Sequence, residues 1–256
     1  MTGNEASPPL LEISGAIARM RLNRPREHNR IDPADLEVML GHFERVEAAR
    51  QIRVLVVTGT GDRTFSSGYT LSRLTGLSAE AVTFEEVIDR LETLRVPTIA
   101  AINGGLYGGA TDLALACDFR VGVSGLRLRM PAAHIGLHYY PSGLRRYIER
   151  LGLSAAKQIF LLGEMVPAEQ LLRWGFLTEV AAPALFAARV QALAAQLAAA
   201  APAAVQRMKR HLNAIAGGRF DDQAVRADYV ESLCSEDLQE GLAALAEKRP
   251  PRFTGD

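Results

Sequence analysis

The chain has 256 residues, of which 48% are hydrophobic and 23% are charged, the composition of an ordinary globular protein. Lys plus Arg and Asp plus Glu each number 29, so the formal net charge is zero and we expect no nucleic acid partner. The N-terminus lacks the basic and apolar stretches of a signal peptide, and no apolar run reaches transmembrane length. Cys117 and Cys234 match no zinc or redox spacing, which predicts free thiols in a cytoplasmic protein with no metal site and no membrane contact.

The first half of the chain alternates between strand and helix patterns. Residues 10–22 predict two short strands around Gly15. A helix is predicted after Asp32, which can cap it, because Pro33 suits a first helical position and apolar residues then recur at helical spacing. Further strands are predicted at 53–59, 97–104 and 119–123, and further helices at 84–96 and 107–118. Strands that alternate with helices indicate an α/β protein with largely parallel pairing.

From about residue 143 the chain is mostly helical. Helices are predicted near 143–150, 154–161, 167–173, 183–199, 202–214, 221–233 and 236–247. The Ala-rich run at 190–204 is interrupted by Gln191, Gln196 and Pro202, so we interpret it as a packed helix and its end. We therefore divide the chain into a core, residues 1–200, and a helical C-terminal subdomain, residues 201–256.

Two predicted strands end in glycine-rich turns, "FSSGYTL" at 65–71 and "NGGLYGGATDL" at 103–113. Neither turn has the spacing of a phosphate-binding loop, so we exclude nucleotide binding of that kind. Gly108 and Gly109 open a helix whose first N–H groups have no partner within the helix. With an N–H from the other turn they would form a two-donor oxyanion hole, in which each donor is worth about 3–4 kcal/mol.

The turns and the stretches around them resemble the crotonase (enoyl-CoA hydratase/isomerase) superfamily. The similar stretches follow the family order along nearly the whole chain: "LNRPREHN" (22–29), "VLVVTGTGDRTFSSG" (54–68), "AAINGGLYGGATDLALACDFRVG" (100–122), "PAEQLLRWGFLTEV" (167–180) and "SEDLQEGLAALAEKRPPRFTG" (235–255). The resemblance implies an α/β fold built as a spiral of repeated ββα units, with a helical C-terminal trimerisation region. It also implies a homotrimer or a dimer of trimers that acts on an acyl-CoA thioester. Coenzyme A would be part of the substrate, and no cofactor would be tightly bound.

The resemblance also implies which residues contact the thioester. By position, the two oxyanion-hole donors would be the backbone N–H groups of Tyr69 and Gly109. The residues in contact with coenzyme A would be Arg26, Ser67, Gly68 and Gly108, with Arg73 as a looser candidate. Arginine suits the phosphates of coenzyme A because its guanidinium binds them as a planar fork. The core, residues 1–200, would hold both the oxyanion hole and the coenzyme A site.

Family hydratases use two glutamates, and this chain has neither. The first glutamate lies three residues after the second oxyanion glycine, which is Asp112 here, a carboxylate one methylene shorter. A displacement of about 1 Å can lower a rate roughly 100-fold, so we expect Asp112 to act through a water or on a differently placed substrate. The second glutamate follows a proline, and after Pro131 this chain has Ala132, which cannot transfer a proton.

The segment "RMPAAHIGLHYYPSG" (129–143) supplies other groups near Ala132. We assign Ala132, His138 and Tyr140 to the substrate pocket, and His134 is a further proton-transfer candidate. An alignment on "IGL" puts Tyr139 where methylmalonyl-CoA decarboxylase, a member of the family, has an active-site tyrosine. Tyr139 and Asp112 are therefore the two candidate catalytic residues.

Three hypotheses follow from this pattern. The first is an acyl-CoA enzyme that stabilises a thioester enolate in the oxyanion hole, with hydration by Asp112 alone or another enolate reaction. The second is a decarboxylase-type lyase that uses Tyr139. The third is a CoA-thioester-binding protein impaired in catalysis, which Ala132 favours and the retained Gly108, Gly109 and Asp112 disfavour.

Overall fold

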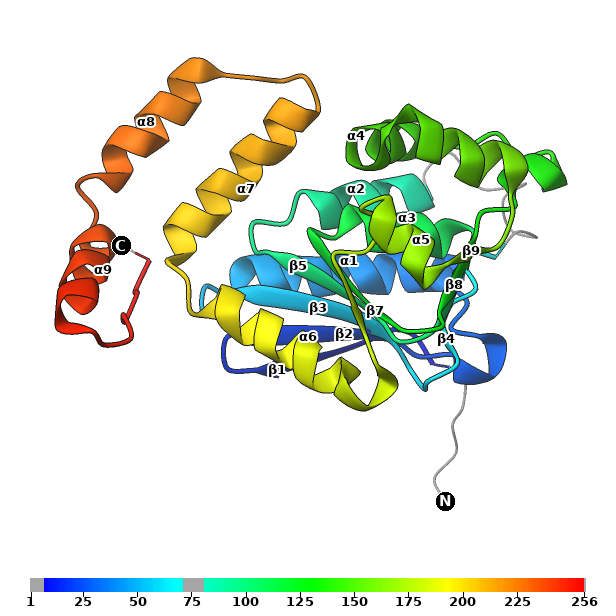
Figure 1. Ribbon diagram of the computed structural model, residues 1–256, viewed down its shortest axis with the longest axis horizontal. Helices are drawn as coiled ribbons and strands as arrows, with labels where there is room; N and C mark the ends of the chain where they lie inside the picture. The colour runs from blue at the N-terminus through cyan, green and yellow to red at the C-terminus, as the bar shows by residue number, and fades with distance from the viewer. Residues whose placement is uncertain (1–6, 71–80, 256) are drawn as a thin grey trace.

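Two β-sheets form the centre of the structure, a computed structural model that describes residues 7–70 and 81–255 (Figure 1). Within these residues the larger sheet has the order β1-β2-β3-β5-β7-β10, and the smaller sheet has the order β4-β6-β8-β9. The strands are β1 (Leu10–Ser14), β2 (Ile17–Leu22), β3 (Val54–Gly59), β4 (Thr64–Ser66), β5 (Thr98–Ile102), β6 (Gly105–Tyr107), β7 (Phe119–Val123), β8 (Arg127–Arg129), β9 (Val166–Pro167) and β10 (Glu179–Ala181). The pairs β1–β2 and β8–β9 are antiparallel, and the other pairs are parallel.

Successive strands enter the two sheets in turn. β3, β5 and β7 lie in the larger sheet, and the strand after each of them lies in the smaller sheet. The helices α2 (Phe84–Glu92), α3 (Gly109–Ala116) and α4 (Pro141–Lys157) follow these strand pairs. This arrangement is the predicted spiral of ββα units, so the predicted fold class is confirmed.

The remaining helices begin where the sequence supplies caps or prolines. They are α1 (Pro33–Ala48), α5 (Ala168–Arg173), α6 (Pro183–Ala198), α7 (Pro202–Ala216), α8 (Asp222–Ser232) and α9 (Glu236–Glu247), with 3₁₀ turns η1 (Pro25–Glu27) and η3 (Ala132–Ile135) and a π-helical turn η4 (Gln158–Leu162). Pro33 is the first residue of α1, and the Asp35 carboxylate accepts a hydrogen bond from the Asp32 N–H at 2.9 Å. This start was predicted because proline lacks the N–H that a first helical turn leaves unpaired.

The central strand β3 is buried on both faces, as its continuous apolar run predicts. Leu55 and Val57 face the main core, which α1, α2 and α3 also line. Val54 and Val56 face a second core against α6. Successive side chains of a strand point to opposite faces, so one strand supports both layers.

The helices α7, α8 and α9 lie to one side of the sheets (Figure 1). Few of their side chains are buried within the chain, among them Lys209 of α7 and Ala244 of α9. Lys209 anchors α7 to the core, because its Nζ donates to the Val96 carbonyl at 2.8 Å and pairs with Asp118 at 2.7 Å. No single described helix is long and apolar enough to span a membrane, and α6 with α7 passes that test only as a pair bent by 103°.

The predicted long elements are confirmed, and the short strands are new. The sequence patterns showed no sign of β4, β6, β8, β9 or β10, which have two or three residues each. The alternation of apolar and polar residues that predicts a strand cannot be recognised over two or three residues. The helices predicted at 143–150 and 154–161 belong to α4 and η4, with a break at Gly152, where φ is 76° and ψ is 163°.

Candidate functional site

The smaller sheet brings the predicted site segments together. β6 pairs in parallel with β4 on one side and with β8 on the other. Parallel strands end at the same edge of a sheet, and ligands of α/β proteins commonly bind beyond that edge. The turn that holds Tyr69, the start of α3 and the loop 130–140 each follow one of these three strands. Segments that are far apart in the sequence therefore meet at one edge.

Two backbone N–H groups lie close together at this edge. Gly68 has a φ of 92°, and a Cβ there would lie 2.5 Å from the Tyr107 carbonyl oxygen and 3.0 Å from the Gly109 nitrogen. A Cβ on Gly109 would lie 3.5 Å from the Tyr69 nitrogen. Gly109 is the first residue of α3, after Gly108 at the N-cap, and no hydrogen bond within 7–70 and 81–255 uses the N–H of Tyr69 or Gly109. The two N–H groups are therefore close together and without a hydrogen-bond acceptor among the described residues, as the predicted oxyanion hole requires.

Asp112 lies in the first turn of α3 and has 0% of its surface exposed. Its Oδ2 accepts hydrogen bonds from the Tyr140 hydroxyl at 2.5 Å and from Arg146 Nη1 at 2.6 Å. Its Oδ1 is also buried and has no hydrogen-bond partner among the described residues. Buried polar atoms are normally paired, so Oδ1 is the atom available to a water or a substrate group.

The protonation states of the site follow from burial and from the Asp112 charge. Burial raises the pKa of the Asp112 carboxyl above its ordinary value, while the charge of Arg146 and the hydrogen bonds from Arg146 and Tyr140 oppose the rise. Burial and the nearby Asp112 charge raise the pKa of Tyr139 and of Tyr140 well above that of an ordinary phenol. Both tyrosines are therefore neutral phenols that can donate a hydrogen bond.

Tyr139 and Tyr140 form a stacked pair beside Asp112. Their ring centroids are 4.3 Å apart, and the Tyr139 hydroxyl donates to the Tyr140 hydroxyl at 3.2 Å. A Cβ on Gly143 would lie 2.4 Å from the Tyr139 ring, so glycine at this position lets the rings pack on the first turn of α4. Tyr140 contacts the carboxylate directly, and Tyr139 lies one hydrogen bond further away.

The rest of the loop 130–140 contributes no acid. Ala132 is buried in η3, so the position of the second family glutamate is apolar. His134 and His138 are exposed. Nε2 of His134 lies 2.7 Å from the Leu162 carbonyl oxygen, and Nδ1 of His138 lies 2.8 Å from the Tyr139 carbonyl oxygen. Both rings are thus engaged with backbone rather than with Asp112.

The residues predicted to contact coenzyme A lie in two segments that bind each other. The Ser67 N–H donates to the His28 carbonyl at 2.8 Å, and its hydroxyl donates to the Glu27 carbonyl at 3.2 Å. These bonds hold the turn of Arg26 beside Ser67 and Gly68. Arg26 is exposed and lines a cavity of about 390 Å³. Arg73 lies outside the described residues.

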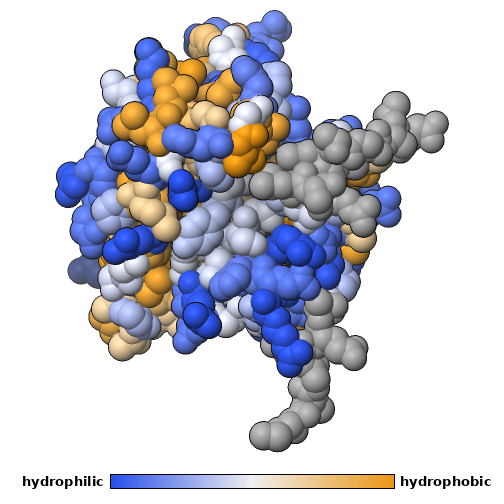
Figure 2. All heavy atoms as spheres, turned by 90° about the vertical axis from the view of Figure 1, so that its right-hand side faces the viewer, coloured by the Kyte–Doolittle hydropathy of each residue, from blue (hydrophilic) through white to orange (hydrophobic). Residues whose placement is uncertain are grey.

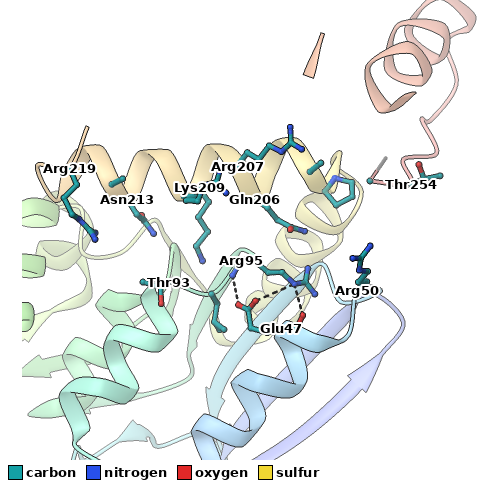
Figure 3. A pocket seen from close by; sticks show the side chains of 16 residues that line it. Glu47, Arg50, Thr93, Arg95, Gln206, Arg207, Lys209, Asn213, Arg219 and Thr254 are labelled. Carbon is teal, nitrogen blue, oxygen red and sulfur yellow. Dashed lines mark hydrogen bonds and ion pairs between the residues drawn. The ribbon is translucent and has the colours of Figure 1, made fainter. Parts of the chain in front are cut away.

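A large cationic cavity lies elsewhere, between α7 and the ends of α1 and α2 (Figure 3). Its volume is about 870 Å³, and Arg95 and Lys209 are among its lining residues. Arg95 donates to carbonyls at the C-terminal end of α1, at 3.0 Å to Val46 and 2.8 Å to the C-cap residue Ala49, while Lys209 pairs with Asp118. These cations join helices to the core. None of the predicted site residues within the described ranges lines this cavity.

Comparison with known proteins identifies the family. Residues 12–256 match the family model described as Enoyl-CoA hydratase/isomerase. The chain belongs to this family. The relationship inferred from the glycine turns is thereby confirmed, and the protein is an enzyme of the crotonase superfamily.

Several family members are similar along their whole length. (E)-benzylidenesuccinyl-CoA hydratase of Thauera aromatica is 29% identical, over 97% of this chain and 99% of its own. Carnitinyl-CoA dehydratase of Salmonella arizonae is 31% identical, over 96% of this chain and 97% of its own. The crystal structure of an enoyl-CoA hydratase/carnithine racemase from Magnetospirillum magneticum has a TM-score of 0.92 and 28% identity, over 98% of this chain and 96% of that one.

The sequence patterns missed two contacts at the site. They singled out Tyr139 for chemistry, whereas Tyr140 donates to Asp112. They assigned no role to Arg146, which is completely buried and bonded to Asp112. An arginine among the charges of "RRYIER" has no distinguishing pattern, so only the packing of α4 against α3 reveals its contact.

Proposed function

We propose that the enzyme adds water to, or removes it from, an acyl-CoA thioester through an enolate, with Asp112 as the carboxylate that transfers the proton. The main support is the buried Asp112 carboxylate, whose Oδ1 has no hydrogen-bond partner among the described residues. Asp112 lies in the first turn of α3, and the first N–H of α3, that of Gly109, lies beside the N–H of Tyr69. Proton transfer and enolate stabilisation need these two elements within reach of one thioester.

The proposed reaction gives each group a defined role. The thioester oxygen accepts hydrogen bonds from the Tyr69 and Gly109 N–H groups, which stabilise the negative charge of the enolate. Asp112 takes a proton from a water molecule while the water oxygen bonds to the β-carbon of an enoyl thioester. The protonated Asp112 then transfers this proton to the α-carbon of the enolate, so that one carboxylate serves both steps. Tyr140 donates to Oδ2 throughout and steadies the anion.

The relatives support this reaction class. A hydratase and a dehydratase, named for the addition and the removal of water on two different CoA thioesters, both match nearly the whole chain. The alternative is a decarboxylase-type lyase that uses Tyr139 as its phenol. Its supporting observation is the neutral Tyr139–Tyr140 pair, since a phenol can protonate an enolate after loss of CO₂.

The proposal also includes the coenzyme A site and the assembly. Arg26, Ser67, Gly68 and Gly108 would contact coenzyme A as part of the substrate, because their segments adjoin the oxyanion pair. A cytoplasmic location and the division of the chain at residue 200 stay predictions.

A homotrimer or a dimer of trimers would cover the apolar surface that the single chain leaves exposed. The exposed apolar residues of α7, α8 and α9 and the turns between them include Met208, Leu212, Phe220, Tyr229, Leu233, Leu242 and Leu245. Apolar residues also gather in the upper part of the face seen in Figure 2. The exposed apolar residues of α4 and η4 include Leu153, Leu161 and Leu162. Large exposed apolar patches usually mark interfaces.

The loss of the enoyl absorbance of crotonyl-CoA tests the proposed reaction. We expect a decrease with the purified enzyme, and no decrease at high enzyme concentration would contradict hydration of this substrate. Release of CO₂ from methylmalonyl-CoA would instead select the decarboxylase. Binding of acyl-CoA without turnover of a broad panel of thioesters would favour a binding protein impaired in catalysis.

A further inference from the structure

Three helices meet at the side chain of Arg146. This residue belongs to α4 and has 0% of its side chain exposed. Its Nη1 donates to Asp112 Oδ2 of α3 at 2.6 Å, and its Nη2 donates to Asp89 Oδ1 of α2 at 2.7 Å. Its Nε lies 3.1 Å from Glu92 Oε1, also of α2. Because the guanidinium is rigid and planar, the contacts with α2 fix the direction from which Nη1 meets Asp112.

The charges around Arg146 leave its positive charge available to Asp112. Glu92 also pairs with Arg145 at 2.7 Å and with Arg150 at 3.5 Å. Burial acts to raise the pKa of Glu92, but Arg146 and Arg145 outweigh it and the pKa falls below its ordinary value. Glu92 is therefore an anion that two other arginines help to neutralise. Asp89 has 43% of its side chain exposed, so solvent screens its charge.

The two oxygens of Asp112 are in different states because of these contacts. Oδ2 accepts two donors, one from Arg146 and one from Tyr140. Oδ1 accepts none among the described residues. A carboxylate held at one oxygen by donors from two directions cannot rotate freely, so its other oxygen keeps one position. Asp112 lies at the site, whereas Asp89 and Glu92 lie behind Arg146 on another helix.

We propose that Arg146 is a positioning residue, which holds Oδ2 so that Asp112 stays ionised and presents Oδ1 to the substrate. The inference rests on the proposed role of Asp112 as the base. The reaction rate must then depend on pH, because a carboxylate acts as a base only when it is ionised. The rate must fall as the pH falls through the pKa of Asp112, and that pKa must depend on Arg146.

Substitution of Arg146 separates its charge from its geometry. In Arg146→Met the loss of the positive charge raises the pKa of Asp112, so the acid limb of the kcat/KM profile moves to higher pH, by about 1–3 units. In Arg146→Lys the charge remains, so the limb stays near that of the wild type, while kcat falls because an ammonium cannot form the planar fork.

Arg145→Met is the matched control. Arg145 is the neighbouring residue on α4 and donates to Glu92 and Glu149, but it does not contact Asp112. We expect the acid limb of the kcat/KM profile of Arg145→Met to lie at the same pH as that of the wild type. A limb that moves equally in Arg145→Met and Arg146→Met would show a general loss of structure and overturn the proposal.

Glu92→Gln tests the proposal in the opposite direction. The Glu92 charge raises the pKa of Asp112, so its removal should lower that pKa and move the acid limb to lower pH. If Arg146→Met does not fold, as judged by circular dichroism, Glu92→Gln serves as the test. An acid limb at lower pH in Glu92→Gln supports the proposal, and an unchanged acid limb contradicts it.

A direct titration separates this inference from the proposed reaction. The Asp112 carboxyl can be followed by ¹³C NMR in protein labelled at aspartate, and assigned by the signal that Asp112→Asn removes. We expect its pKa to rise in Arg146→Met and to fall in Glu92→Gln, whether or not crotonyl-CoA is hydrated. A pKa that is unchanged in both variants would overturn the role of Arg146, even in an active hydratase.

Discussion

The two sides of the site are held by different forces. On the α3 side, Asp112 is fixed by a buried ion pair and a short phenol hydrogen bond. On the loop side, Ala132 has no polar group, and Tyr139 and Tyr140 are stacked neutral phenols, of which Tyr140 donates to Asp112. In a two-glutamate hydratase both sides would bear a carboxylate. Under the proposed reaction, proton transfer therefore depends on the α3 side, and the loop side shapes the pocket.

Removal of the carboxylate should have the largest effect. Asp112→Asn keeps the size of the side chain but cannot accept a proton, so we expect the hydration rate to fall about 10²–10⁴-fold, the usual contribution of a general base. The absorbance of crotonyl-CoA measures this. A hydration rate of Asp112→Asn equal to that of the wild type would show that Asp112 takes no part in the reaction. The α3 side would then not be the side that transfers the proton.

The adjacent tyrosines form a matched pair for the next test. Tyr140→Phe removes the donor to Asp112 Oδ2, and we expect a loss of about 10–100-fold, the value of a hydrogen bond to a charged group. Tyr139→Phe removes only a bond between two phenols, and a loss of about 2–10-fold is expected. The reverse order, measured as kcat/KM, would favour the Tyr139 lyase.

Alanine substitutions at one glycine on each side compare how tightly the backbone is packed there. Gly68, at the oxyanion turn, has a φ of 92° and closely approaches the Tyr107 carbonyl, whereas Gly136, in the loop, has a φ of 74° and open space within 4 Å of the point where a Cβ would lie. Alanine strains both, but only Gly68→Ala also forces backbone apart. We expect Gly68→Ala to lower the free energy of unfolding by about 1–3 kcal/mol more than Gly136→Ala does. Equal thermal denaturation midpoints would contradict this.

The smallest effect is expected at Ala132. Ala132→Ser adds one hydroxyl at a position to which the proposed reaction gives no part in proton transfer, so the barrier should change by less than about 0.5 kcal/mol, roughly a factor of two in rate. The crotonyl-CoA assay measures this change. A loss as large as that of Asp112→Asn would place essential chemistry on the loop side.

The sequence predicts more of the framework than of the site. Long elements such as the helix after Asp32 have clear caps and periodicity, and they are confirmed. The strands β4, β6 and β8 are too short to show a pattern, yet they bring the three site segments to one edge. The family pattern identified Asp112 and Ala132, but the contacts of Tyr140 and Arg146 depend on how α3 and α4 pack. Packing between helices leaves no local signal in either one.

The central claim is that the site forms a thioester enolate and that Asp112 moves its proton. Exchange of the α-protons of butyryl-CoA in D₂O, followed by mass spectrometry, tests this without assuming the physiological substrate. We predict deuterium at the α-carbon with the wild-type enzyme and with Ala132→Ser, and none above background with Asp112→Asn. Absence of exchange with the wild type, or undiminished exchange with Asp112→Asn, would contradict the account.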